Sequence, residues 1–550
     1  MIRFNKYILI GTIGLFTASC SDFLNTTPYD ALSPSTTWKT EEDAQKFAVG
    51  CYDGWEDGGN ILYMDCTSDF AYNNFPWEGY KNLGNGTFTA SSGDHNAYDF
   101  TTIRRCNTFL EKINDIPFVD EVAKKDLIAQ IRVIRAYQYF TMNWWYGGVP
   151  IINNYMSAEE AKVPRNTEAE VRTFIEKELD ECTPDLNKEP SVRGRLGRGA
   201  ALAFRMREAL YYGDYTTAKA KAQAITALGL YELEPSYANL FRLTGRSSKE
   251  IIAAVQYMPV NRVLGVIGQM YNNGDGGWSS IVPTQNLVDT YEMSNGLTKD
   301  ETGSTYDPTH PFANRDPRMA MSIYYPGCNF TKDDGSVVIF NTLDKNFPDG
   351  KANPNYALAA DNASKTGLTW AKYLDPITQY NATGIWDTEA CPIVFRYAEV
   401  LLTFAEAENE LNGPSTSVYT AINDVRLRSG MPKVDETKYN TKEKLRELIR
   451  RERGVEFAGE GLRRADLVRW KGDDGKMVAE KVLNGVLERA VGTVSTDATI
   501  DPELRATINP NADAKDKKVE DRTFKAHNRY WPIPQSAKDS NPKLTQNEGY

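Results

Sequence analysis

The longest helical pattern in the chain covers residues 121–146 and sets the fold class. Apolar or aromatic side chains recur there mostly every three or four residues, which predicts an amphipathic helix with one buried face. The run Gly147-Gly148-Val149-Pro150 follows directly and is a typical helix stop. A 26-residue helix of this kind must bury its apolar face against other helices, so we expect a mainly α-helical protein.

Two further stretches read as helical hairpins. Helices are expected near residues 199–212 and 216–228, joined by a Gly213-Asp214 turn, and near 398–411 and 415–429, joined by Gly413-Pro414. The "GDYTTA" turn, with the small residue Ala218 just after it, resembles the inter-helix turn of tetratricopeptide repeats, where small residues let two helices pack closely. The sequence therefore predicts a scaffold of stacked helical hairpins.

The most charged part of the chain is residues 440–470. Asn440 is expected to cap a helix, with Glu443 reaching back to it. Residues 442–470 hold nine Lys or Arg against six Asp or Glu, so we expect ion pairs that involve Glu452, Glu456 and Asp466. The net charge of the whole chain is −11, which argues against a nucleic-acid partner.

The N-terminus has the layout of a signal peptide. Arg3 and Lys6 precede a ten-residue apolar run, residues 7–16, which is too short to span a bilayer as a helix. Small residues then lead to Cys20, as in the bacterial lipobox, although Thr17 stands where that motif usually has Leu. We expect residues 1–19 to be a lipoprotein signal peptide and Cys20 to be lipidated; the alternative is an ordinary cleavage site.

The remaining cysteines and the histidines give no metal or catalytic motif. Six other cysteines are scattered without a C-x-x-C pair, so they are best explained as small buried apolar residues, although disulfides stay an open alternative. The three histidines, His95, His310 and His527, lie far apart in the sequence, which disfavours a zinc site and a Ser-His-Asp triad. No metal or other cofactor is expected, and a structural calcium ion held by carbonyls and carboxylates stays open.

Several blocks of the sequence resemble the SusD/RagB family of outer-membrane nutrient-binding lipoproteins from Bacteroidetes. The similar blocks occur in chain order: "SDFLNTTPYDALSPSTTWKTEEDAQKFAVGCYDGW", "AYQYFTMNWWYGGVPII", "PTQNLVDTYEMSNG", "PIVFRYAEVLLTFAEAENELNG", "LRELIRRERGVEFAGEGLRRADLVRW" and "YWPIPQSAKDSNPKLTQNEGY". The resemblance implies a SusD-like fold, mainly α, in which tetratricopeptide-type hairpins pack against an irregular, loop-rich portion with short strands. It also implies one domain over residues 20–550, with an N-terminal region at about 20–230 and a C-terminal region at about 270–550.

The same resemblance implies a function without catalysis. Such a protein captures an oligo- or polysaccharide at the cell surface, is held in the outer membrane by the lipid on Cys20, and delivers the glycan to a SusC-type TonB-dependent transporter. Which glycan it binds is not implied.

Two loop-like, aromatic stretches are the predicted glycan-binding regions, because aromatic rings can cover the apolar face of a sugar while amides and carboxylates bind its hydroxyls. The first is residues 69–86 and the second is residues 270–280. Trp77 and Trp278 are the leading candidates. The other predicted ligand-binding residues are Tyr72, Asn73, Asn74, Tyr80, Tyr271, Asp275 and Trp386.

Two other functions stay open from the sequence. A secreted glycoside hydrolase would need two carboxylates across an aromatic cleft, and with 74 acidic residues the sequence alone cannot place such a pair. A peptide- or protein-binding helical scaffold would use the hairpins themselves.

Overall fold

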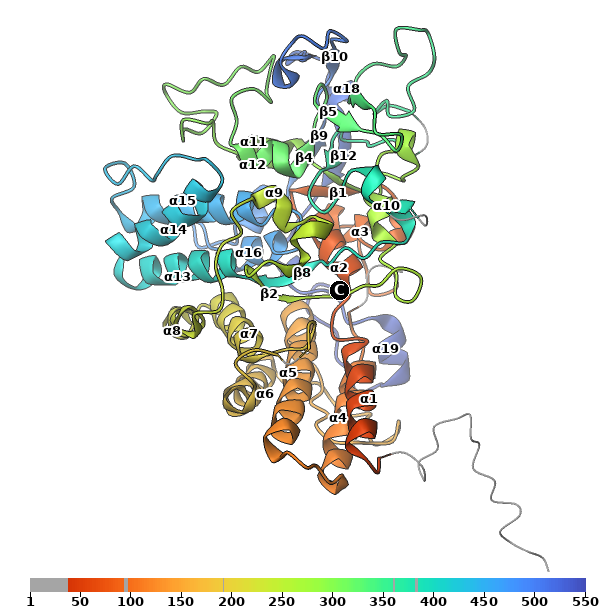
Figure 1. Ribbon diagram of the computed structural model, residues 1–550, viewed down its shortest axis with the longest axis vertical. Coiled ribbons are helices and arrows are strands. Elements are labelled where there is room, and N and C mark those ends of the chain that lie inside the picture. The colour runs from red at the N-terminus through yellow and green to blue at the C-terminus, as the bar shows by residue number, and fades with distance from the viewer. Residues whose placement is uncertain (1–37, 93–96, 191, 360–361, 381–383) are drawn as a thin grey trace, which may run out of the picture.

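The computed structural model describes residues 38–550 apart from 93–96, 191, 360–361 and 381–383. The signal-peptide and lipidation predictions, residues 1–19 and Cys20, lie outside the described residues. Long helices fill the lower part and the left side of the molecule in Figure 1, and short helices and strands joined by loops fill the rest.

The first half of the chain supplies most of the lower helices in Figure 1. The helices of this half are α1 (Glu41–Tyr52), α2 (Gly58–Met64), α3 (Lys81–Asn85), α4 (Thr101–Lys112), α5 (Glu121–Tyr146), α6 (Glu168–Cys182), α7 (Arg198–Tyr211) and α8 (Tyr215–Leu228), of which α2 and α3 lie higher, among the short elements. Helix α5 has the predicted bounds. Asp120 caps it by accepting from the backbone N–H of Val122 (2.8 Å), and Gly147 ends it in the left-handed conformation (φ +66°).

The hairpin of α7 and α8 confirms the expected close approach of two helices. Gly213 turns the chain with φ +75°, and the Asp214 side chain accepts from the backbone N–H of Thr217 (3.0 Å). Ala218 is fully buried and packs with Ala209 and with Ala407 of the second predicted hairpin. Small residues thus bring α8 close to both α7 and α13 (Tyr397–Asn412).

The C-terminal half adds α13, α14 (Thr416–Arg428), α15 (Lys442–Glu456) and α16 (Arg463–Arg469). The sequence predicted Asn440 as the cap of α15, and this prediction is wrong. The cap is Thr441, whose backbone is extended (φ −121°) and whose side chain accepts from the backbone N–H of Lys444 at 3.4 Å. The one-residue shift places Lys444, and not Glu443, at the third helical position.

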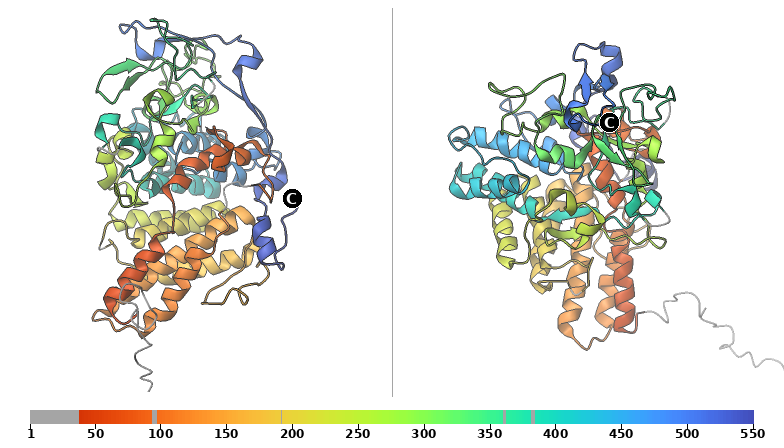
Figure 2. Two further views of the ribbon diagram at one scale, coloured as in Figure 1. Left: turned by 90° about the vertical axis from the view of Figure 1, so that its right-hand side faces the viewer. Right: turned by 45° about the horizontal axis from the view of Figure 1, so that its top comes forward.

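Short helices connect the remaining segments. They are α9 (Tyr237–Leu240), α10 (Val266–Met270), α11 (Gln285–Thr290), α12 (Pro317–Ser322), α17 (Ala479–Val482), α18 (Ala514–Lys517) and α19 (Gln535–Ser540). Figure 2 shows α19, near the end of the chain, beside the N-terminal helices. Just before α19, the ring of Trp531 stacks on Trp145 of α5 at 4.6 Å between centroids.

The strands of the described residues form two-stranded antiparallel pairs. They are β1 (Ala71–Asn73) with β3 (Ile281–Pro283), β2 (Ile251–Ala254) with β8 (Ile393–Arg396), β4 (Ile323–Tyr324) with β7 (Thr369–Trp370), β5 (Asn329–Thr331) with β6 (Val337–Ile339), β9 (Gly485–Glu488) with β12 (Lys518–Arg522), and β10 (Gly492–Val494) with β11 (Ala506–Ile508). The β1–β3 and β2–β8 pairs join segments that are far apart in the sequence, so they tie the irregular portion together.

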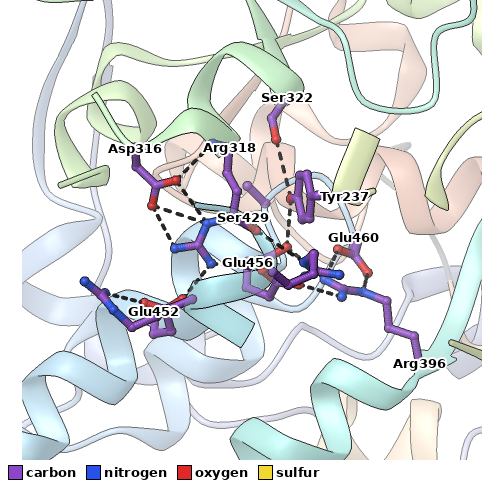
Figure 3. A network of polar contacts seen from close by, with 12 residues as sticks. Tyr237, Asp316, Arg318, Ser322, Arg396, Ser429, Glu452, Glu456 and Glu460 are labelled. Carbon is purple, nitrogen blue, oxygen red and sulfur yellow. Dashed lines mark hydrogen bonds and ion pairs between the residues drawn. The ribbon is translucent and has the colours of Figure 1, made fainter. Parts of the chain in front are cut away.

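A buried network of charged side chains holds the helical hairpins to the irregular portion (Figure 3). Arg318 of α12 donates to Glu452 (2.6 Å) and Glu456 (2.9 Å) of α15. Arg396, at the end of β8, also donates to Glu456 (2.7 Å), as does Arg428 of α14. The prediction that Glu452 and Glu456 form ion pairs is confirmed, and their partners come from several elements.

Asp466 forms a second buried group of ion pairs within the charged segment. It accepts from Arg453 (3.0 Å) and Arg469 (2.8 Å), as expected. Both arginines also lie beside Glu406 of α13, which is likewise buried. Part of the charge of residues 442–470 is therefore paired inside the protein, and burial of these groups depends on their pairing.

The described cysteines are buried free thiols: Cys51, Cys66, Cys106, Cys182, Cys328 and Cys391. They pack with apolar neighbours, as the sequence favoured. Within the described part of the chain, the helices are either too short or too polar to cross a membrane.

Candidate functional site

The β1–β3 pair brings the two predicted binding stretches together. Asn73 lies opposite Ile281, and the backbone N–H of Asn74 donates to the carbonyl of Ser280 (2.9 Å). Residues 74–80 follow β1, and residues 270–280 precede β3. Because the pair is antiparallel, both loops leave it at the same end. Two stretches some 200 positions apart thus form one surface.

Trp77 is the most exposed aromatic residue of this surface. It lies in a short 3-10 helix, Pro76–Glu78, and 75% of the residue is accessible to solvent. Its ring stacks on that of Phe75, with 4.7 Å between centroids and 22° between planes. Phe75 therefore supports the ring from one side, and the other face of the Trp77 ring is open to a binding partner.

Trp278 and Trp386 form a second aromatic pair. Their centroids lie 4.6 Å apart, and Trp278 is 43% exposed while Trp386 is half-buried. Trp386 rests on Gly268 of α10, where an added Cβ would lie 2.4 Å from its ring. The backbone N–H of Trp278 donates to the carbonyl of the same Gly268 (3.2 Å). Both rings are thus positioned by one glycine.

The backbone around Trp278 is well fixed. Gly276 turns with φ +83°, and Ser279 also lies in the left-handed region, with φ +46°. That conformation is uncommon for a residue other than glycine. It is held here by a hydrogen bond from the N–H of Ser279 to the carbonyl of Tyr271 (2.9 Å). Strained backbone of this kind is often found at binding sites.

Glu78 connects the two loops and was not predicted from the sequence. Its carboxylate accepts from the Asn73 amide (2.6 Å) and lies 3.5 Å from the Gln269 amide, next to Gly268. Burial raises the pKa of Glu78. In the sequence, only its position next to Trp77 could have indicated that Glu78 belongs to this surface. We call Phe75, Trp77, Glu78, Trp278 and Trp386 the aromatic platform.

Three predicted aromatic residues lie inside the protein. Tyr72 receives a hydrogen bond from the Lys81 ammonium (2.7 Å), the Tyr80 ring stacks on Tyr63 at 4.7 Å, and the Tyr271 hydroxyl donates to the carbonyl of Asp375. All three predicted tyrosines are buried.

The predicted polar residues line the base of the same loops. Asn73 and Asn74 are buried, and the Asn74 Nδ2 group has no hydrogen-bond partner among the described residues. Asp275 forms an ion pair with Lys332 (3.2 Å). A buried amide without a partner needs an explanation, and a water molecule or a ligand hydroxyl would satisfy it.

Nothing in this arrangement forms a metal site. Among the described residues, no group of three or more His, Cys, Asp or Glu side chains is placed to hold a metal ion. The platform offers stacked rings, amides and one half-buried carboxylate.

Comparisons with known proteins agree with the fold. The family model described as "SusD family" matches residues 250–550, and the model described as "Starch-binding associating with outer membrane" matches residues 22–210. The chain belongs to the SusD family.

Relatives resemble the chain over most of its length. It is similar to SusD-like protein P38 of Formosa agariphila, with 25% identity over 84% of this chain and 90% of that protein. A SusD-like carbohydrate-binding protein of Bacteroides fragilis has 28% identity and a TM-score of 0.78, covering 92% of this chain and 99% of that one. The fold is also that of surface glycan-binding protein A from Bacteroides uniformis, at 19% identity and a TM-score of 0.67, over 92% and 99% of the two chains. The predicted SusD-like, mainly α fold is confirmed.

Proposed function

We propose that this protein is a non-catalytic, cell-surface lipoprotein that captures an oligo- or polysaccharide on the aromatic platform. The observation that carries the proposal is the pairing of β1 with β3, which brings two exposed tryptophans, Trp77 and Trp278, onto one surface. A solved relative at 28% identity is described as carbohydrate-binding, and one matching family model is described as starch-binding.

The platform suits an extended glycan. Exposed rings backed by Phe75 and Trp386 can pack against the C–H faces of successive sugars, and rigid aromatic residues lose little conformational entropy when they bind. The Asn74 amide is a hydrogen-bond donor that a sugar hydroxyl can use.

The rest of the proposed pathway follows the family. The family model that matches residues 22–210 is described as associating with the outer membrane. We infer that the signal peptide, residues 1–19, is removed, that Cys20 carries the lipid anchor, and that residues 20–550 act as one domain. A SusC-type TonB-dependent transporter would then receive the glycan. The relatives are described as binding proteins, which supports a role without catalysis.

Calorimetry with a panel of polysaccharides tests the binding role. We expect one class to bind, and Trp77→Ala and Trp278→Ala each to weaken its affinity at least about tenfold, as for other central aromatic contacts. Tyr155→Ala is a matched control, because Tyr155 is also an exposed aromatic residue but lies after α5.

Two results would contradict the proposal. Binding that both tryptophan variants leave intact would show that the platform is not the site. Release of shorter sugars from a bound polysaccharide would favour a glycoside hydrolase instead.

A further inference from the structure

Two adjoining cavities lie apart from the aromatic platform and share no residue with it. The larger, of about 450 Å³, is lined by the loop before α2, by α5 and by residues 257, 262 and 263. The smaller, of about 120 Å³, continues from it along α5 toward α7. Both are lined by Glu56, Asn60, Ala97, Tyr137 and Thr141, which we call the junction.

Each cavity has several aromatic residues in its lining. Trp55, Tyr137 and Tyr257 line the larger cavity, and the rings of Trp55 and Tyr137 lie 5.5 Å apart. Phe140, Trp144 and Trp145 line the smaller one. A cavity of this size in which aromatic rings lie beside polar groups can hold a small organic ligand.

Glu56 is the main polar group of the junction. Its carboxylate accepts from the Tyr137 hydroxyl and from the backbone N–H of Asp57 (2.8 Å), and both donors are neutral. A carboxylate has about four acceptor positions, so about two remain for a ligand. The nearby Arg207 does not neutralise it, because that guanidinium is engaged by Glu399 (2.7 Å). Burial raises the pKa of Glu56 to about 6, so it is mostly ionised at neutral pH.

Two further junction groups can orient a ligand. Asn60 accepts from the Tyr80 hydroxyl through its side-chain oxygen (2.9 Å), which orients the amide and its Nδ2 donor. Thr141 adds a hydroxyl. It lies four positions after Tyr137 in α5 and therefore on the same side of that helix. The junction thus offers a carboxylate, an amide donor and a hydroxyl close together.

The charged residues around the larger cavity determine which ligand charge is favoured. Its lining includes four carboxylates, those of Asp53, Glu56, Asp57 and Asp99, and one guanidinium, that of Arg262. Arg262 forms an ion pair with Asp53 (3.7 Å), and no ion pair joins it to the other three carboxylates among the described residues. A lining with this excess of negative charge attracts cations and repels anions.

We propose that the two cavities form a second ligand site, which takes a small molecule bearing a protonated amine. The ammonium group binds Glu56 at the junction, and Trp55 and Tyr257 pack against the body of the molecule. An amino sugar fits this description, and the choice of a sugar body rests on the proposed function. The amine requirement follows from the cavities alone.

Titration calorimetry on the detergent-solubilised full-length protein tests the proposal, with glucosamine as the probe. Glucose and N-acetylglucosamine are neutral analogues of the same size class. We expect glucosamine to bind at least tenfold more tightly than either analogue, and Glu56→Gln to remove this preference. Glu42→Gln, the same change at an exposed position of α1, is the matched control and should have no effect.

The outcomes separate this site from the platform. If Trp77→Ala weakens glucosamine binding and Glu56→Gln does not, the amine binds the platform and the second site is wrong. If no polysaccharide binds but Glu56-dependent glucosamine binding persists, the proposed function fails and this inference stands. Equal affinity for all three sugars overturns it.

A second variant covers the case in which Glu56→Gln does not fold. Thr141→Val removes the junction hydroxyl and keeps the side-chain shape. We expect it to weaken glucosamine binding several-fold, and an unchanged affinity would overturn the proposal.

Discussion

Replacing Glu456 by Gln tests how the hairpins are joined to the irregular portion. Glu456 is fully buried and accepts hydrogen bonds from Arg318 (2.9 Å), Arg396 (2.7 Å) and Arg428. Burial opposes its ionisation, but the three guanidiniums outweigh burial and hold the pKa of Glu456 well below its usual range. The variant leaves these cations facing a neutral amide.

The magnitude follows from the cost of an unbalanced buried charge. Removing one partner of a buried pair costs about 3–5 kcal/mol. Unfolding entropy near 2.1 cal/mol/K per residue gives about 1.1 kcal/mol/K for a folded part of roughly 500 residues. The melting temperature should therefore fall by about 3–5 °C in a calorimetric scan.

Glu447→Gln is the matched control for this experiment. Glu447 lies on the same helix, α15, and pairs with Arg450 at 3.3 Å, but its side chain is 68% exposed. An exposed pair contributes at most about 1 kcal/mol, so this melting temperature should shift by about 1 °C or less. Equal shifts for the two variants would refute the reasoning, because burial would then make no difference.

Other expected results concern anchoring, the platform, acid stability and the second site. Cys20→Ser should move the protein out of the membrane fraction or stall its processing, and unchanged membrane association would refute lipidation. Gly268→Ala should weaken glycan binding in calorimetry without removing a ring, because its Cβ would displace Trp386; unchanged affinity would show that this ring is not used. Burial raises the pKa of Glu406, but Arg469 and other cations outweigh it and hold that pKa at about 2. The stabilisation by ionised Glu406 is thus complete above the unfolded pKa of about 4.3 and is lost as the pH falls toward 2. The melting temperature should therefore drop between these pH values. A melting temperature that does not change over this range would contradict the pairing. Glucosamine binding should weaken as the pH falls below about 6, where Glu56 takes up a proton, and a pH-independent affinity would argue against a carboxylate contact.

The helical scaffold was largely predictable from the sequence, since its signals are local. The bounds of α5 follow from its apolar period and from Gly147, and the turn at Gly213 follows from the residue types that such turns require. The cap of α15 was off by one residue, because Asn440 and Thr441 are both good caps and only the backbone conformation chooses between them.

The platform was predictable as two regions and not as one site. The sequence singled out Trp77 and Trp278 by their flexible, polar neighbours, but no local pattern reveals that β1 pairs with β3. The same limit applies to burial. Tyr72 and Tyr271 look like Trp77 in sequence, yet both lie in the core, because neighbours from distant segments cover them.

The β1–β3 pair also allows the loop side chains to vary while the position of the loops is kept. The pair is made by backbone hydrogen bonds, which do not depend on the identity of the loop side chains. Exposed residues of these loops, such as Trp77 and Trp278, can therefore be exchanged for other rings or amides while the strands still hold the loops side by side. A different ligand preference of the proposed platform would need changes at a few loop positions, including that of Trp386, and none in the long helices.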